Sequence, residues 1–139
     1  MRVGVDTNLF IRLIVDDDSV QSAAVERLAR EHHLIVTATA LLETEWVLRR
    51  VLGLDREQIV AGFERLLGLQ TATFLHRELV STAMRAFRAG CDFADALHAA
   101  LATGVDVFAT FDRAFARRAK PLDYLPPVRT LPVTGILLA

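Results

Sequence analysis

The chain has 139 residues, the size of one domain with a core of its own. Its single cysteine, Cys91, excludes an intrachain disulfide and a zinc site built from cysteines. It has no apolar run of about 18 residues and no basic region followed by an apolar signal stretch, so we expect a cytoplasmic protein without a membrane span. The hydrophobic fraction of 53% leaves room for a large core or for an apolar surface that a partner covers.

The net charge of −1 conceals an asymmetry. If several acids gather in one pocket, the remaining surface is net basic. Among the sixteen cations Lys120 is the only lysine, and the rest are arginines. Arginine binds phosphate bidentately through its planar guanidinium, which fits a nucleic-acid ligand. A GC-rich coding bias explains the same preference equally well.

Strand and helix patterns alternate in the first half of the chain. A polar break at Asp16, Asp17, Asp18 and Ser19 has the chemistry of a helix start, and Thr39 is the expected cap of a later helix. The predicted elements are, in order, a strand at 2–5, helices at 9–15 and 20–32, a strand at 34–37, and helices at 40–52 and 55–68.

The second half continues this alternation. The predicted elements are a strand at 71–75, helices at 78–89 and 93–103, a strand at 105–110, a helix at 112–120 and a short edge strand at 128–131. The chain has no repeat and no linker, so we expect one domain over residues 1–139. Alternating strands and helices predict an α/β fold with a parallel sheet, in which ligands bind beyond the carboxyl ends of the strands.

Four acids occur where separate apolar segments end or turn: Asp6, Glu43, Asp95 and Asp112. A lone carboxylate in apolar surroundings is costly. If the four converge, two charges about 5 Å apart repel by roughly 3 kcal/mol at an effective dielectric near 20, so protonation or a cation must relieve them. Oxygen ligands without His or Cys favour Mg²⁺ or Mn²⁺. Such ions serve phosphodiester hydrolysis, which here would leave 5′-phosphate and 3′-hydroxyl ends.

Three neighbouring residues are candidate helpers of these acids. Asn8 and Thr110 each stand two positions from an acid and can hydrogen-bond it or a bound water. Asp92 is either the N-cap of a helix or a fifth acid that helps to hold the cation. Each acid also has a plain interpretation when taken alone, as a turn residue or as a complement to a helix dipole.

These residues lie in motifs that resemble those of the PIN-domain ribonucleases, and within them the VapC toxins of toxin–antitoxin pairs. The matching stretches occur in the family's order and are residues 5–9, 43–48, 92–98 and 110–113. The resemblance places the family's acidic positions on Asp6, Glu43, Asp95 and Asp112, with Asn8 and Thr110 as polar helpers. It implies a three-layer α/β/α sandwich with a central parallel sheet, and endonucleolytic RNA cleavage that depends on Mg²⁺ or Mn²⁺.

The resemblance also implies partners. We expect a homodimer and a cognate VapB-like antitoxin that blocks the site, with RNA as the substrate. The helices near residues 55–69 and 76–89 are similar to the helical pair that family members offer to such a partner. Their apolar faces are equally well explained as ordinary core.

Arginines on the last predicted helix are the best candidates for RNA phosphate contacts: Arg113, Arg117 and Arg118. Arg12, Arg49 and Arg50 are weaker candidates. Such contacts carry affinity and salt dependence but do not select a sequence. Trp46, one turn after Glu43, is expected to pack in the core.

Three other functions are compatible with parts of the pattern. A phospho-acceptor receiver domain has this size, but it needs a paired acidic site after the first strand and a lysine after the last one. Here Asp6 is followed by Thr7, and Lys120 lies beyond a helix. A PIN-like domain that binds RNA or protein without cutting, and an RNA-processing nuclease outside toxin–antitoxin systems, both remain open.

Overall fold

A computed structural model gives the structure of residues 1–15 and 19–131. The chain divides into two compact units, Met1–Arg77 and Glu78–Ala139. The expected polar break at 16–18 lies outside the described residues. Ser19, which follows it, caps the next helix as predicted, because its hydroxyl accepts a hydrogen bond from the Ser22 backbone N–H at 3.1 Å.

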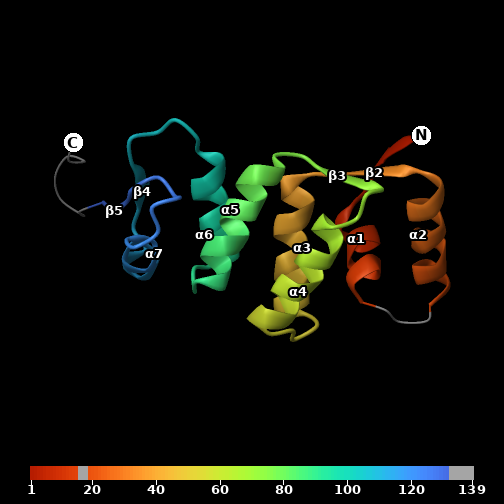
Figure 1. Cartoon of the computed structure of the whole chain (residues 1–139). Coiled ribbons are helices and arrows are strands. Elements are labelled where there is room, and N and C mark those ends of the chain that lie inside the picture. Colours follow the sequence, from red (N-terminus) through yellow and green to blue (C-terminus); the bar gives the residue numbers. More distant parts are fainter. Residues whose placement is uncertain (16–18, 132–139) are drawn as a thin grey trace. The chain divides into compact units, whose positions relative to one another are not determined.

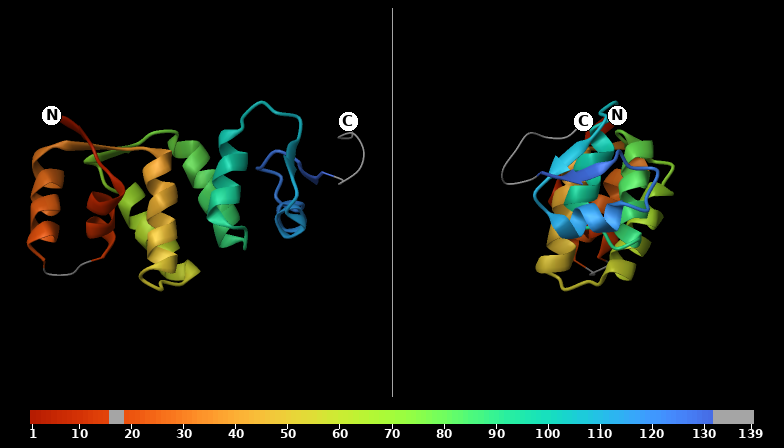
Figure 2. Two further views of the ribbon diagram at one scale, coloured as in Figure 1. Left: turned by 180° about the vertical axis from the view of Figure 1, so that it is seen from behind. Right: turned by 90° about the vertical axis from the view of Figure 1, so that its left-hand side faces the viewer.

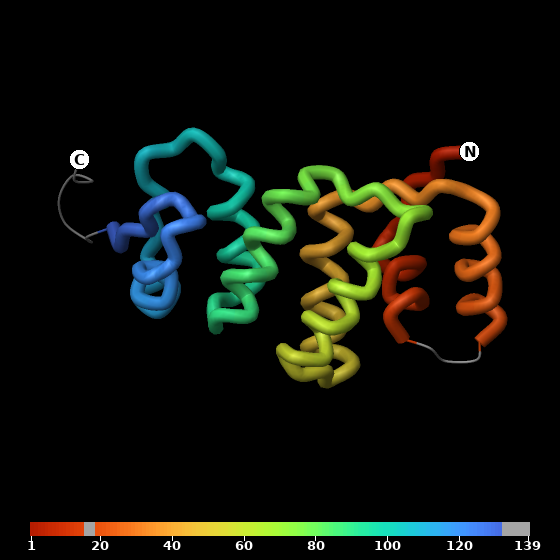
Figure 3. Tube along the Cα trace, viewed as in Figure 1, coloured from red at the N-terminus to blue at the C-terminus, as the bar shows by residue number. Residues whose placement is uncertain are grey.

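The first unit is a parallel sheet with connecting helices. Its elements are β1 (Arg2–Gly4), α1 (Thr7–Ile14), α2 (Val20–Glu31), β2 (His33–Val36), α3 (Ala38–Arg50), α4 (Arg56–Leu67) and β3 (Ala72–Phe74) (Figures 1 and 3). The strands lie in the order β1-β2-β3 and are parallel, with Leu34 paired to Val3 and Ala72. Right-handed crossovers between successive neighbours put both connections on one face of a sheet. Figures 1 and 2 show α1 to α4 on the same side of these strands.

The core of this unit lies between that face and the helices. Leu34 and Val36 of β2 are fully buried, and Phe10 of α1 contacts Phe74 of β3 edge to face, with ring centroids 5.8 Å apart. Each such side chain contributes roughly 1.5–3 kcal/mol by leaving water. Packing of α1 on the sheet therefore fixes the position of the loop between β1 and α1.

Helix starts follow the capping rules, with one correction. The predicted start at Asp55 is confirmed: its carboxylate accepts from the Gln58 N–H at 2.8 Å, and the Gln58 side chain accepts from the Asp55 N–H at 2.9 Å. Thr39 was the wrong choice for the cap of α3. Thr37 has the extended backbone of an N-cap, and its hydroxyl accepts from the Ala40 N–H at 3.2 Å.

One expectation on α3 is also corrected. The buried stripe of this helix consists of Leu41, Thr44, Glu45 and Leu48 at helical spacing, with Ala40 beside it. Trp46 lies off that stripe and is 52% exposed, so it is not a core residue. Arg49 pairs with the buried Glu45 carboxylate at 2.7 Å, while its contact with RNA phosphate stays a prediction. A buried carboxylate needs such a partner.

The second unit contains the remaining elements. They are α5 (Arg77–Arg88, which starts at the unit boundary), α6 (Phe93–Leu101), β4 (Phe108–Thr110), α7 (Arg113–Ala119) and β5 (Val128–Thr130). β4 and β5 pair in parallel, and α7 lies between them in the chain. The strand predicted at 105–110 begins only at Phe108, because pairing starts where the Phe108 N–H donates to the Pro127 carbonyl at 2.8 Å. The helix predicted at 93–103 ends at Leu101, shortly before Gly104 with its φ of +80°.

Aromatic pairs mark the interior of the second unit. Phe87 of α5 meets Phe93 of α6 edge to face at 5.7 Å, and Phe108 of β4 meets Phe115 of α7 at 6.2 Å. Cys91, in the turn between α5 and α6, is fully buried. The turn that leads into α6 is thus held by packing on both sides of Asp92.

The α/β class with parallel strand pairing is confirmed, and it is consistent with a three-layer α/β/α sandwich. Within the described ranges the strands form a three-stranded sheet in the first unit and a two-stranded sheet in the second. No helix in the described part of the chain is long and apolar enough to cross a membrane.

Candidate active site

Asp6 lies in the turn between β1 and α1 and is the N-cap of α1. Its carboxylate oxygen Oδ1 accepts a hydrogen bond from the Leu9 backbone N–H at 3.0 Å. The side chain is exposed, while its neighbours Val5 and Thr7 are buried. The positive end of the α1 dipole favours a negative charge at this position. The sequence suggested an acid in apolar surroundings; the structure instead shows an exposed carboxylate between buried neighbours.

Glu43 approaches the same turn from α3. Its carboxylate oxygen Oε2 accepts a hydrogen bond from the Thr7 hydroxyl at 3.0 Å. Because Thr7 directly follows Asp6, this bond ties Glu43 to the segment that carries Asp6. Thr7 was not among the residues predicted for the site, although a hydroxyl residue directly beside a predicted ligand is a signal for such a role. Thr7 is 7% exposed, so its hydroxyl has few alternative partners.

Asp92 and Asp95 lie at the start of α6 in the second unit. Asp92 is the N-cap, and its Oδ2 accepts from the Asp95 N–H at 3.2 Å, which is the capping role that the sequence allowed. Burial raises the pKa of the partly buried Asp95 carboxyl above its ordinary value, and the negative charges of Asp92 and Asp112 raise it further, whereas His98 acts in the opposite direction. Three carboxylates of this unit therefore share one electrostatic environment.

Asp112 follows β4 and is the N-cap of α7. Its Oδ1 accepts from the Phe115 N–H at 2.9 Å, and its own N–H donates to the Thr110 hydroxyl at 3.0 Å. Thr110 thus orients the backbone of the acid, a supporting contact of the kind expected for it. Asp112 is exposed.

Within each unit the structure connects two of the predicted acids. Asp6 and Glu43 are linked through Thr7, and Asp95 lies in the field of Asp112. Among residues 1–15 and 19–131, no three His, Cys, Asp or Glu side chains form a group that could hold a metal ion. A site made of all four acids therefore remains a prediction.

The donor chemistry of both pairs fits a hard divalent cation. Carboxylates with a hydroxyl or an amide beside them supply oxygen ligands and hydrogen bonds, as Mg²⁺ and Mn²⁺ require. The pKa of Asp95 is raised first by burial and then by repulsion from Asp92 and Asp112, and a cation would relieve that repulsion. The residues present therefore suit such an ion.

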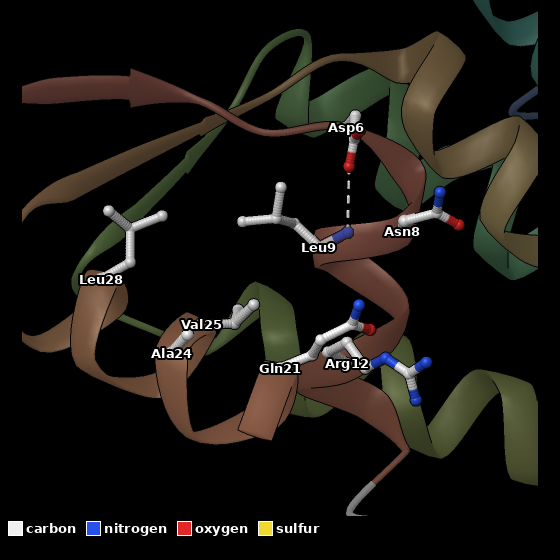
Figure 4. Close-up of a pocket in the computed structure, with 8 residues that line it drawn as sticks. All are labelled: Asp6, Asn8, Leu9, Arg12, Gln21, Ala24, Val25 and Leu28. Atoms are coloured by element: carbon white, nitrogen blue, oxygen red, sulfur yellow. Dashed lines mark hydrogen bonds between the residues drawn. The ribbon is translucent and has the colours of Figure 1, made fainter. Parts of the chain in front are cut away.

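A pocket of about 390 Å³ adjoins the first pair of acids. It lies between α1 and α2 and is lined by Asp6, Asn8, Leu9, Arg12, Gln21, Ala24, Val25 and Leu28 (Figure 4). Asn8, the predicted helper, is exposed in the first turn of α1. One of the predicted acids thus stands at the edge of a cavity large enough for a small ligand.

The three candidate arginines lie on α7: Arg113 in its first turn, and Arg117 and Arg118 in its last turn. All three are exposed. Cations in a last turn complement the helix dipole, so Arg117 and Arg118 have a structural role whether or not they bind phosphate.

The comparison with known proteins gives one family. The PIN domain family matches residues 3–121, which include all four acids and segments of both units. PIN domains are generally nucleases that act on RNA, and they typically use divalent metals. No curated protein sequence matches the chain significantly.

The raised pKa of Asp95 predicts how the stability of the metal-free protein depends on pH. A carboxyl group whose pKa is higher in the folded than in the unfolded protein stabilises the fold when the pH is below its pKa in the unfolded protein. This stabilisation is lost as the pH rises through its pKa in the folded protein. We therefore expect Asp95→Asn to raise the unfolding temperature at pH 7 in EDTA. The difference in unfolding temperature between Asp95→Asn and the wild type should shrink towards zero when the pH is below the ordinary aspartate pKa of about 3.9.

Thermal unfolding followed by circular dichroism checks this, with Asp106→Asn as the matched exposed control. The first-turn dipole of α6 favours the Asp95 charge, but the net upward shift of its pKa shows that desolvation and like charges outweigh it. A lower unfolding temperature for Asp95→Asn at pH 7 would contradict the analysis.

Proposed function

The chain belongs to the PIN domain family, and from this premise we propose that it is an endoribonuclease that depends on Mg²⁺ or Mn²⁺. The observation that carries the proposal is the placement of these acids. Asp6 and Asp112 follow strands and cap helices, Glu43 is hydrogen-bonded to Thr7 beside Asp6, and Asp95 lies in the field of Asp112. Such positions are where ligands bind in parallel α/β folds. In a family of RNA nucleases, this arrangement favours catalysis over binding alone.

Asp6, Glu43, Asp95 and Asp112 are the proposed metal ligands. A bound divalent ion would activate water and neutralise charge on the scissile phosphate. Thr7 would hold the Glu43 carboxylate, and Thr110 would orient the segment that carries Asp112. Asn8 stands beside Asp6, and Asp92 adds negative charge next to Asp95 while it caps α6.

We also propose that the two units belong to one PIN domain. The family match runs through both of them, and each supplies two of the four acids. The unfolding curves described for Asp95→Asn test this, because one domain unfolds in one cooperative transition. Two separate transitions, of which only one responds to the substitution, would contradict it.

The finer assignment is a VapC-type toxin, cytoplasmic and homodimeric, that is neutralised by a VapB-like antitoxin. The motif resemblance of residues 5–9, 43–48, 92–98 and 110–113 supports this assignment. On this proposal Arg113, Arg117 and Arg118 contact RNA phosphates, which their exposure on α7 permits.

The first prediction of this proposal concerns RNA cleavage. The purified protein should cut a total-RNA pool at discrete positions in Mg²⁺ or Mn²⁺ and not in EDTA, leaving 5′-phosphate ends. Asp6→Asn and Asp112→Asn should each lower the rate by about a hundredfold or more. Asn remains a good N-cap, so both substitutions remove a ligand while keeping the helix start.

A double-mutant cycle tests whether acids from the two units work together. Residues that act as a unit are strongly non-additive, so the Asp6→Asn/Asp112→Asn double variant should be little worse than either single variant. Glu57→Gln and Asp106→Asn remove exposed acids elsewhere and serve as controls. Variants of Asp6 that cut as fast as the wild type would place the activity at another site or in a contaminant.

The second prediction concerns Thr7. Thr7→Val removes the hydroxyl that holds Glu43 and nearly keeps the side-chain shape. We expect it to weaken the apparent affinity for Mn²⁺ by about tenfold, the typical effect of losing a ligand's supporting contact. The metal concentration that gives half-maximal cleavage is the measurement. Thr7→Ser keeps a hydroxyl and should retain most of the affinity for Mn²⁺. If Thr7→Ser binds Mn²⁺ as weakly as Thr7→Val, the lost affinity comes from altered packing and not from the missing hydroxyl.

The third prediction concerns toxicity. Induced expression in a bacterial host should arrest growth, and Asp6→Asn should abolish the arrest without lowering the amount of protein. Co-expression of a small neighbouring gene that encodes a DNA-binding protein should relieve the arrest. Robust RNA cleavage by the purified protein without any arrest would favour an RNA-processing nuclease instead.

A further inference from the structure

The pocket between α1 and α2 has the composition of a small-ligand site. Its apolar part consists of Leu9 from α1 and Ala24, Val25 and Leu28 from α2. In Figure 4, Leu9 points from α1 into the space towards α2. Pockets that bind small molecules are mostly apolar, with a few polar groups that fix orientation. The volume of about 390 Å³ lies at the lower end of their range.

The charged residues of the pocket, Asp6 and Arg12, do not belong to this apolar wall. Figure 4 shows Asp6 at one end of the view and Arg12 with Gln21 at the other. Asp6 and Arg12 are six positions apart along α1, a separation of about 9 Å at a rise of 1.5 Å per residue. The backbone positions that carry an acid suited to a metal ion and a permanently charged guanidinium are therefore set by one helix and its cap.

A nucleotide has the matching chemistry. Its base has an apolar face for the wall and polar edges for the side-chain amides of Asn8 and Gln21. Its phosphate suits the guanidinium of Arg12, which can bind two oxygens at once. A helix from a protein partner would instead need a longer apolar strip with anchors on successive turns. The short wall bounded by charged residues favours the nucleotide.

We propose that the pocket between α1 and α2 binds one nucleotide of the single-stranded RNA substrate beside the scissile phosphate. The base packs on Leu9 and Leu28, and a flanking phosphate contacts Arg12. This inference rests on the proposed nuclease function, since it places the nucleotide next to Asp6. The pocket selects which position of the RNA is presented to the acids.

The test fills the pocket from an exposed position of α2. Ala24 lines the pocket, and Ala23 is exposed on the same helix without lining it. Ala24→Trp and Ala23→Trp therefore add the same side chain to adjacent positions. Both variants are checked for wild-type unfolding temperature before use.

The first readout uses the four nucleoside 5′-monophosphates, titrated in EDTA into isotope-labelled protein and followed by NMR. We expect amide shifts at Leu9, Gln21 and Ala24, a dissociation constant raised about tenfold by Ala24→Trp, and little change for Ala23→Trp. Because no metal and no cleavage are involved, this result is independent of the nuclease activity.

The second readout uses RNA. Ala24→Trp should raise the KM for a short single-stranded RNA or change the position of the cuts, with kcat affected less. Arg12→Gln should reduce the slope of log affinity against log salt by about 0.7, the value for one phosphate contact on a single strand. A residue that only supports the fold would not change this slope.

The outcomes separate the two hypotheses. A wild-type protein that binds nucleotides in the pocket but cuts no RNA overturns the nuclease function and leaves nucleotide binding standing. A wild-type protein that cuts RNA, with Ala24→Trp identical to it in both readouts, overturns the pocket assignment alone. If Ala24→Trp instead disrupts a complex with a second copy or a protein partner and leaves nucleotide binding unchanged, the pocket is a protein-docking site and the inference is wrong.

Discussion

Compensation of carboxylate charge by hydrogen-bond donors is the constraint on which the positions of the candidate acids depend. Asp6, Asp92 and Asp112 are each the N-cap of a helix, and each accepts a hydrogen bond from a backbone N–H at the start of that helix. A helix N-terminus carries about half a positive elementary charge, so it compensates an acid before any cation arrives. The turns that precede α1, α6 and α7 thus each supply a charge-compensated position for an acid.

Glu43 obeys the same constraint by a different contact. It lies within α3 and not at its start, so no free backbone N–H groups of that helix are available to it. The Thr7 hydroxyl donates to it instead, from the first turn of α1. This contact requires α1 and α3 to pack together, and the buried Phe10 and Leu48 lie on those two helices. The position of Glu43 therefore depends on the core, whereas the three capping acids are positioned by local structure.

This difference explains what the sequence could and could not predict. Element types followed from apolar periodicity, and the acids that end strands were recognisable from local pattern. The cap of α3 was misplaced because Thr37 and Thr39 are chemically identical candidates, and the strands were overestimated because their length is set by pairing partners. Thr7 was missed because its role depends on a contact 36 positions away. The pairing of Arg49 with Glu45 was not predicted, although their spacing of four is itself a signal for an ion pair.

Helix α1 contributes residues both to the proposed catalytic site and to the proposed nucleotide pocket. It begins with the Asp6 cap, presents Thr7 to Glu43 in its first turn, and carries Arg12 on the wall of the pocket. Sites built on helices hold their groups more accurately than sites on loops. Because one helix and its cap carry both Asp6 and Arg12, a nucleotide seated in the proposed pocket would have its neighbouring phosphate near both residues. Changes on the α2 side of the pocket can then alter which phosphate is presented while the acids that would cleave it stay in place.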